Sequence, residues 1–159
     1  MAKKQQKTNV MRVLDAAKIK YNEYTFDGEY TSGVEIAREM GQPVERVFKT
    51  LVTVGKSGQH YVFMVPVAEE LDLKKAAKAV GEKSIAMIKS KELLPLTGYI
   101  HGGCSPIGMK KQFPTAIHET AAQYETIFFS GGRIGFQVEI APDDLFKVVR
   151  VETADLIVV

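Results

Sequence analysis

Residues 48–67 read FKTLVTVGKSGQHYVFMVPV, and this stretch indicates the fold more clearly than any other part of the chain. Two runs rich in β-branched and aromatic residues, 48–54 and 61–67, flank the segment GKSG at 55–58. Short glycine-rich segments join antiparallel strands, because glycine adopts the backbone angles that a tight turn requires. The stretch therefore predicts a β-hairpin.

Short helices are predicted on both sides of the hairpin. Apolar residues recur at helical spacing within 8–18, and Ser32 with Glu35 forms a capping box for a helix that ends at Gly41. The other expected helical segments are a helix from the N-cap Asp72 to Gly81, a turn at 92–94 before Pro95, and a helix from Ala141 to Val149.

Further short strands complete the pattern. They are expected at 20–26, 85–88, 115–118, 125–129 and 136–140, with the apolar residues 156–159 as a closing strand. Many short strands with interspersed helices favour a single α+β domain around a strongly bent or closed sheet.

Composition excludes several classes of protein. The 159 residues are 45% hydrophobic and 25% charged, which is typical of a globular protein with one core. The formal net charge is only +2, so a nucleic acid would have to bind to a local basic surface. A single cysteine excludes an internal disulfide and fits a reducing compartment. No run approaches the roughly 18 apolar residues of a membrane span.

The first residues are polar and basic. Residues 1–8 contain lysines and glutamines with no apolar segment behind them, so we expect a flexible basic tail and not a signal peptide. Together with the cysteine count, this predicts a cytoplasmic protein.

Residues 101–111, HGGCSPIGMKK, form the most suggestive loop of the chain. Glycine lets the main chain approach a ligand closely and expose its N–H groups, and adjacent lysines attract anions. The loop is therefore suited to hold a phosphate, a carboxylate or a polarised ester. A solvated hairpin loop explains the same residues, and the loop alone does not decide between the two.

Two further features carry candidate binding groups. Lys49 stands among apolar residues at a helix-to-strand junction, where a partly buried ammonium is often matched to an anion; a lysine that reaches solvent fits equally well. The turn SGGRIG at 130–135 offers N–H donors beside a hydroxyl, although a plain strand connection has the same composition. It is not a dinucleotide-binding loop, because no helix follows it in a βαβ unit.

No pattern predicts a metal site or a cofactor. Cys104 is the only thiol, and the three histidines have no ligand spacing with it or with one another. No histidine–acid arrangement that would activate Cys104 is visible, so we interpret it as a small packing residue. Any catalysis would then rest on positioning, on main-chain dipoles and on a reactive group of the substrate.

Four blocks, taken together and in order, resemble the YbaK/EbsC family of free-standing homologues of the editing domain of bacterial prolyl-tRNA synthetase. The blocks are VFKTL at 47–51, LDLKK at 71–75, TGYIHGGCSPIGMKK at 97–111 and SGG at 130–132. The resemblance runs from about residue 8 to residue 155, and it implies that residues 9–159 are one editing domain. The implied fold is a single compact α+β domain with a mixed, barrel-like β-sheet and surrounding helices.

The resemblance also implies an activity and partners. It implies a trans-editing deacylase that removes cysteine from mischarged Cys-tRNA(Pro), and also acts on Cys-tRNA(Cys), without a cofactor. Prolyl-tRNA synthetase is the implied protein partner. Lys110 and Lys111 are the candidates for contacts with tRNA phosphates.

Site residues are carried over from the matching blocks. Lys49 matches the lysine needed for activity, and Gly102 and Gly103 would lie at the aminoacyl ester and donate to its oxyanion. The implied substrate-binding residues are Thr50, Ser105, Ser130, Gly131, Gly132, Gln137, Phe26 and Tyr30. Phe26 replaces a tyrosine and Gln137 replaces an aspartate of the best-studied branch, and both changes bear on selectivity for cysteine.

The implied mechanism suits a site without an acid–base pair. The thiol of the substrate would attack its own ester carbonyl and close a small ring, while Lys49 would hold a phosphate or counter developing charge. Two alternatives stay open. One is a hydrolytic deacylase for another small aminoacyl-tRNA. The other is a non-catalytic module that binds tRNA or the synthetase through its basic tail and the lysines at 74–75 and 110–111.

Overall fold

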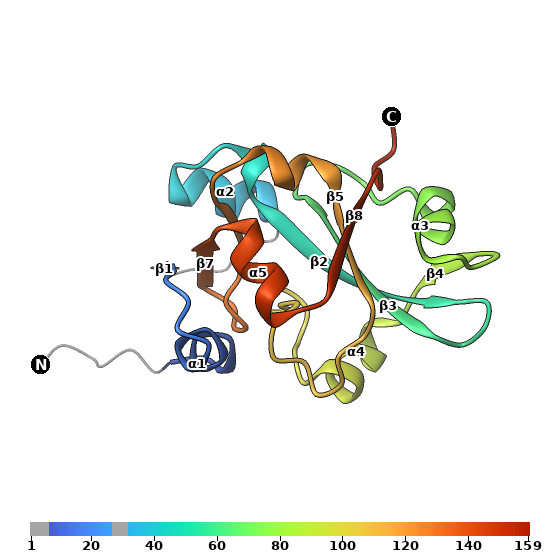
Figure 1. The fold of residues 1–159 in the computed structure, drawn as a ribbon, viewed down its shortest axis with the longest axis horizontal. Helices are drawn as coiled ribbons and strands as arrows, with labels where there is room; N and C mark the ends of the chain where they lie inside the picture. Colours follow the sequence, from blue (N-terminus) through green and yellow to red (C-terminus); the bar gives the residue numbers. More distant parts are fainter. Residues whose placement is uncertain (1–6, 27–31) are drawn as a thin grey trace, which may run out of the picture.

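The computed structural model describes residues 7–26 and 32–159, which form two β-sheets with helices around them (Figure 1). The helices are α1 (Asn9–Ala16), α2 (Gly33–Met40), α3 (Leu73–Val80), α4 (Ser90–Thr97) and α5 (Pro142–Val148), with 3-10 helices η1 (Val44–Arg46) and η2 (Glu119–Gln123). The strands are β1 (Asn22–Thr25), β2 (Phe48–Gly55), β3 (His60–Pro66), β4 (Ile85–Met87), β5 (Thr115–His118), β6 (Ile127–Ser130), β7 (Phe136–Ile140) and β8 (Val151–Ala154).

The predicted hairpin is confirmed and lies in the middle of the larger sheet. β2 and β3 pair antiparallel from Phe48–Pro66 to Val54–His60, and they cross the molecule as its longest strands (Figure 1). The strand order is β4-β2-β3-β5-β8, with parallel pairs β3–β5 and β5–β8. The sheet is therefore mixed.

A smaller antiparallel sheet, β1-β7-β6, lies beside the first, and the described residues form no closed barrel. The single α+β domain with a mixed sheet that the resemblance implied is confirmed, but the sheet does not close into a barrel. β6 meets the β2 chain at one isolated bridge, Val47–Phe128, and β4 pairs only with Thr53–Gly55 at the far end of β2. Closure requires continuous pairing around the sheet, and on this edge the stretch of β2 between these two contacts has no neighbouring strand.

The predicted helix caps around the hairpin are confirmed. Ser32 accepts from the Glu35 N–H, and Asp72 accepts from the N–H groups of Lys74 and Lys75. Gly41 and Gly81 end their helices in the left-handed conformation, which glycine adopts at little cost. At the N-terminus, Thr8 is buried and caps α1, whereas residues 1–6 of the expected tail lie outside the described residues.

Two predicted boundaries were wrong. Pro95 does not end a helical turn: α4 continues to Thr97 and ends at Gly98, whose N–H bonds to Leu94. A proline removes one N–H donor, and the glycine three residues later provides the stronger stop. The closing strand is β8 at Val151–Ala154 and not residues 156–159, because that segment pairs only at the isolated bridge Leu71–Ile157, and the Leu156 N–H bonds to the His118 side chain.

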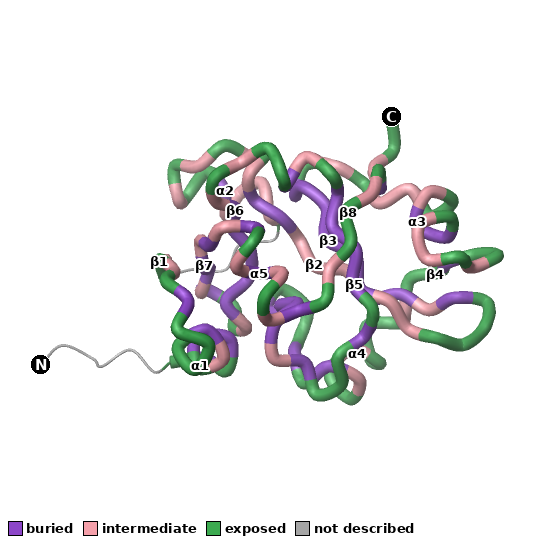
Figure 2. Tube along the Cα trace, in the orientation of Figure 1, coloured by how far each residue is buried: buried purple, intermediate pink, exposed green. Residues whose placement is uncertain are grey.

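The main hydrophobic core lies between the two sheets and beneath α1 and α5. Its largest fully buried side chains include Phe48, Ile107, Ile127 and Phe129. A second cluster fills the space under α3. Figure 2 shows that β3, β5 and β6 are buried over most of their length, whereas β2 is partly open near its middle. The open part of β2 is where the candidate site lies.

Candidate active site

A cavity of about 650 Å³ lies along the unpaired stretch of β2. β4 covers one end of this edge, and the Val47–Phe128 bridge to β6 closes the other. The cavity is lined by residues of β2, the loop at 101–104 and the turn at 130–135, with side chains from α2, α4 and β7. Segments far apart in the sequence therefore share one wall.

The hydrogen-bond pattern of β2 determines which main-chain groups face this cavity. The Val47 carbonyl accepts from the Val67 N–H on the β3 side, at 2.8 Å. Groups alternate along an antiparallel ladder, so odd-numbered residues bond to β3 and even-numbered residues face away, as the Ile88 N–H bond to the Val52 carbonyl confirms. Thr50 therefore presents its N–H and C=O to the open edge.

Lys49 lines the cavity and is partly buried, as its apolar neighbours in the sequence predict. Burial lowers the pKa of its ammonium group, and the carboxylates of Glu70 and Glu69 offset part of that decrease. Within the described part of the chain Lys49 forms no salt bridge. A partly desolvated cation without an ion-pair partner is suited to an anionic or polarised ligand.

The two glycine turns meet at the cavity wall. Gly102 lines the cavity with φ at 88°, and Gly103 packs against the second turn. A Cβ atom at position 103 would lie 3.0 Å from the Ile134 nitrogen and 3.2 Å from the Arg133 Cα. Glycine is therefore required at position 103 for the two turns to approach this closely.

Gly103 and Gly131 stand behind the wall and not in the cavity. The Gly103 N–H donates to the Ile100 carbonyl at 2.9 Å, and the Gly131 N–H donates to the Phe136 carbonyl at 2.8 Å. Both donors are occupied by the protein itself. The oxyanion contact that the resemblance implied for Gly103 is therefore not prepared in this geometry, whereas Gly102 is on the surface of the cavity.

The predicted serines have different positions. Ser130 lines the cavity, and its Oγ accepts from the Gly132 N–H at 3.1 Å, which holds the second turn in shape. Gly132 itself lies behind the wall, like Gly131. Ser105 is fully buried away from the cavity, and its Oγ accepts from the Ile107 N–H at 3.4 Å.

Thr50 and Gln137 both line the cavity and both carry an oxygen with no partner. Thr50 Oγ1 and Gln137 Oε1 are buried and have no hydrogen bond among the described residues. Gln137 is only 6% exposed. A buried polar atom without a partner costs about 1–3 kcal/mol, so such atoms point to a ligand that supplies the missing donor.

Lys49, Gly102 and Ser130 come from three separate sequence blocks and line one cavity. The family model for the aminoacyl-tRNA editing domain matches residues 28–148, which include all three blocks. The chain belongs to this family.

Relatives of this editing domain extend over the whole chain. EbsC of Enterococcus faecalis, assigned as a Cys-tRNA(Pro)/Cys-tRNA(Cys) deacylase, is 47% identical over 160 residues, which is 98% of each chain. A solved structure described as a trans-editing enzyme for prolyl-tRNA synthetase is 26% identical, with a TM-score of 0.82 over 98% of this chain and 100% of that one. A proline–tRNA ligase of Fervidobacterium nodosum is 26% identical over 146 residues, and the chain spans 25% of its length.

The remaining predicted residues of the editing domain divide into three groups. Phe26 lines the cavity. Tyr30 lies outside the described residues. Lys110 and Lys111 are exposed and do not line the cavity: Lys110 lies beside Gly98 at the end of α4, and the Lys111 ammonium lies 5.9 Å from the centre of the Phe113 ring.

Sequence reasoning missed the apolar part of the wall. Leu93, His101, Cys104 and Ile134 line the cavity together with Ile36 and Val67. The glycine loops were the available signal for His101, Cys104 and Ile134, whereas no sequence signal indicated Leu93, Ile36 or Val67. Burial raises the pKa of the Cys104 thiol to about 12, which keeps it protonated and unreactive. Its interpretation as a packing residue is consistent with this.

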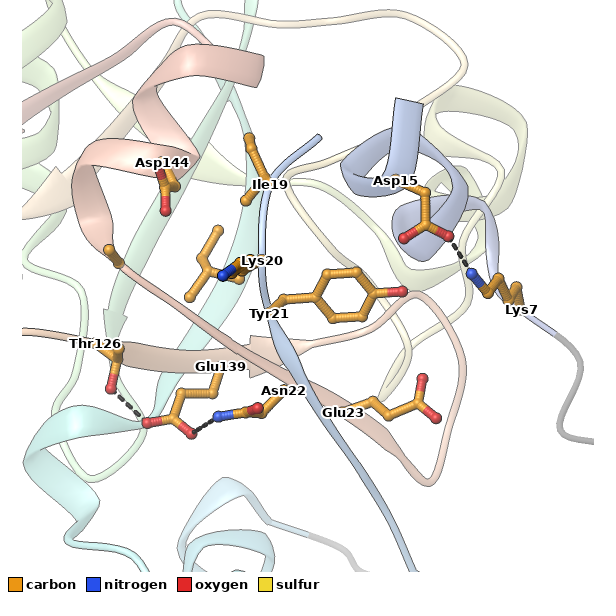
Figure 3. A pocket seen from close by; sticks show the side chains of 12 residues that line it. Lys7, Asp15, Ile19, Lys20, Tyr21, Asn22, Glu23, Thr126, Glu139 and Asp144 are labelled. Carbon is orange, nitrogen blue, oxygen red and sulfur yellow. Dashed lines mark hydrogen bonds and ion pairs between the residues drawn. The ribbon is translucent and has the colours of Figure 1, made fainter. Parts of the chain in front are cut away.

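A second, wider depression of about 680 Å³ lies between α1, β1 and the start of α5 (Figure 3). Figure 3 shows Lys7 directed toward Asp15, and Asn22 and Thr126 directed toward Glu139. Burial alone would raise the pKa of Glu139, but hydrogen bonds from Thr126, Asn22 and the Tyr24 hydroxyl outweigh burial and lower it. The carboxylates at 15 and 139 thus have partners already, and we interpret this network as structural.

Two kinds of feature are absent from the described residues. No helix there is long and apolar enough to cross a membrane. No group of three or more histidine, cysteine, aspartate or glutamate side chains is arranged to hold a metal ion.

Proposed function

We propose that this protein is a trans-editing deacylase that releases cysteine from Cys-tRNA(Pro) and Cys-tRNA(Cys). The 47% identity to EbsC over nearly the whole of both chains supports this substrate. The structural observation that carries the proposal is the position of Lys49, which lines one cavity with Gly102 and Ser130 and has no salt-bridge partner among the described residues.

The chemistry of the cavity wall favours a reaction in which the substrate brings its own nucleophile. The described wall residues include one thiol, Cys104, and its raised pKa makes it a poor nucleophile. No aspartate or glutamate among these residues stands beside His101 to make an acid–base pair. Ester cleavage then depends on holding the substrate in an attack geometry, which contributes on the order of 7–11 kcal/mol in favourable cases.

In the proposed step, the cysteine sulfur forms a bond to the carbonyl carbon of its own ester. The carbonyl–ribose oxygen bond breaks, the ribose oxygen takes up the proton that the thiol has lost, and a cyclic thioester leaves the tRNA. The N–H of Thr50 at the open edge of β2 is a donor for the developing oxyanion, and Gly102 lets the ester approach the main chain closely. Lys49 counters the charge that develops on the reacting oxygens.

We propose two sets of macromolecular contacts for this activity. Lys110 and Lys111 are exposed and are proposed to contact tRNA phosphates. Lys75 is less suited to this role, because its ammonium already bonds to Asp155 and to the Ile157 carbonyl. Similarity to a quarter of a proline–tRNA ligase supports an association with that synthetase, and with these partners the expected compartment is the cytoplasm.

A panel of tRNAs charged with cysteine, serine or alanine tests the proposal. Wild-type protein is expected to release cysteine at least tenfold faster than serine or alanine, because the serine hydroxyl is a far weaker nucleophile than a thiol and the alanine side chain has no nucleophile. Lys49→Ala is expected to lose this activity. Lys56→Ala, an exposed lysine in the β2–β3 turn, is the matched control and is expected to keep it.

The outcomes separate the alternatives. Equal release of serine and cysteine would replace the thiol mechanism with hydrolysis by water. Unchanged release by a folded Lys49→Ala variant would mean that the cavity is not catalytic and would favour a binding module.

A further inference from the structure

Two unpartnered oxygens in the cavity come from different sheets. Thr50 Oγ1 belongs to β2 of the larger sheet, and Gln137 Oε1 belongs to β7 of the smaller one, where Gln137 pairs with Tyr24 and Ser130. Both residues line the same cavity, and Gln137 is 6% exposed. Other buried side chains near them, such as Ser105 and Thr53, have hydrogen-bond partners. Thr120 Oγ1 in η2 is the third buried side-chain oxygen without a partner among the described residues, and it lies outside the cavity; the other two line the cavity together.

We propose that Thr50 and Gln137 bind the α-ammonium group of the aminoacyl ester through these uncharged oxygens. The inference rests on the proposed function, because it concerns the same substrate in the same cavity.

The hydrogen-bonding chemistry of the substrate selects the ammonium group. The carbonyl and ester oxygens of an aminoacyl-tRNA are acceptors and require donors, which the Thr50 N–H and the Lys49 ammonium provide. The thiol is a weak donor, whereas an ammonium group carries three strong N–H donors. Hydrogen bonds to a charged donor are also stronger than those between neutral groups.

The charge of the cavity explains why neutral acceptors suit this role. None of the described residues that line the cavity is an aspartate or glutamate, and Lys49 is the one lysine among them. A carboxylate at position 137 would attract the ammonium of Lys49 as well as that of the substrate, and an ion pair with Lys49 would draw this lysine away from the ester. An amide and a hydroxyl bind the substrate ammonium and leave Lys49 free for the reaction.

The test compares two esters on the same tRNA, cysteinyl and 3-mercaptopropionyl. The second keeps the thiol and the ester and lacks only the α-ammonium group, so it introduces no bulk. Each ester is assayed with wild type, Gln137→Leu and Thr50→Val, and each rate is divided by the uncatalysed rate of that ester. Thr53→Val is the matched control, because it removes a hydroxyl from the same strand outside the cavity.

Wild type is expected to prefer the cysteinyl ester by tenfold or more in kcat/KM. Gln137→Leu and Thr50→Val are expected to lose most of this preference, with rates on the 3-mercaptopropionyl ester changed less than about threefold. Thr53→Val is expected to keep the full preference even if it is less stable. Equal losses on both esters in Gln137→Leu and Thr50→Val would overturn the inference, because they would indicate a general defect. The inference would also be overturned if Gln137→Leu and Thr50→Val lost a wild-type preference for a terminal ribose with a 2′-hydroxyl over a 2′-deoxyribose, because the two oxygens would then bind the ribose hydroxyl and not the ammonium group.

A binding measurement keeps the inference separate from the proposed function. Cysteine and 3-mercaptopropionate are each linked through an amide to 3′-amino-3′-deoxyadenosine, which the protein cannot cleave by the ester route. Calorimetry is expected to show at least tenfold weaker binding of the deaminated compound to wild type, and a smaller ratio for Gln137→Leu. If wild type cleaves neither ester but shows this binding pattern, the proposed function fails and the inference holds. Equal binding of both compounds to wild type would overturn the inference alone.

Discussion

Gly103→Ala tests whether the contact between the two glycine turns shapes the cavity. A Cβ atom at position 103 would lie 3.0 Å from the Ile134 nitrogen and 3.2 Å from both the Cα and the carbonyl carbon of Arg133. These are main-chain atoms and cannot rotate away, so the turns must separate by a few tenths of an ångström. Overpacking of this kind costs about 1–3 kcal/mol. For a chain of this length each kcal/mol corresponds to about 2–4 °C in Tm, so the expected decrease is about 2–12 °C.

The same displacement is expected to reduce activity. Gly102 precedes the substituted residue and lines the cavity, so separating the turns moves it away from the substrate. A misplacement of 1 Å can cost about a hundredfold in rate, and the smaller shift here is expected to cost about tenfold in kcat/KM. Release of cysteine from Cys-tRNA measures this, at a temperature well below the unfolding transition.

Gly58→Ala is the control for a general loss of stability. Gly58 lies in the β2–β3 turn with φ at 93°, and no atom lies within 4 Å of the Cβ it would gain. The left-handed backbone costs about 1–2 kcal/mol there, with no effect expected on the cavity. Both variants are thus expected to melt earlier, and only Gly103→Ala to lose activity. A Gly103→Ala variant as stable and as active as wild type would refute the reasoning.

Three further perturbations have expected outcomes. Lys49→Met is expected to abolish deacylation without lowering the free energy of unfolding in urea, because burial of the ammonium opposes folding. In wild type, kcat/KM should fall as the pH rises through the pKa of Lys49, which lies below its ordinary value of 10.5. Lys49→Arg should move this alkaline decrease in kcat/KM to higher pH. Burial raises the pKa of Cys104 from 9.0 to about 12, so the stability that this thiol contributes is present below pH 9 and is lost as the pH rises above that value. Cys104→Ala should remove this part of the alkaline loss of stability in urea titrations and keep deacylation activity. A loss of activity in this variant would contradict the packing role of Cys104. Asp72→Ala removes the cap of α3 and should lower the free energy of unfolding by about 0.5–2 kcal/mol with deacylation unchanged; an unchanged Tm would show that the cap contributes nothing.

Local sequence patterns predicted those parts of the fold that local contacts stabilise. The hairpin at 48–67, the caps at Ser32 and Asp72, and the helix ends at Gly41 and Gly81 each depend on hydrogen bonds between residues a few positions apart. The predictions that were wrong concern segments whose contacts come from distant parts of the chain. The closing strand was misplaced because the 156–159 segment bonds to groups far away in the sequence, the His118 side chain and the main chain of residues 70–72, and forms only an isolated bridge.

For the site, the resemblance brought together Lys49, Gly102 and Ser130, and in the structure these three residues line one cavity. It could not separate Gly102 from Gly103, because both have the same residue type in the same loop. Only the packing of one turn on the other shows that the Gly103 N–H is occupied. Ser105 and Ser130 are separated in the same way, by burial and by hydrogen-bond partners.

The order of residues along this chain determines, by itself, its short helices, its central hairpin and its membership in the editing family, since each of these depends on neighbouring residues or on motif order. The tertiary structure alone decides that the sheets stay open along β2, that the two glycine turns touch, and that Thr50 and Gln137 are left with unpartnered oxygens. The physical reason is that a cavity consists of contacts that are not made, and which contacts are missing depends on how distant segments pack.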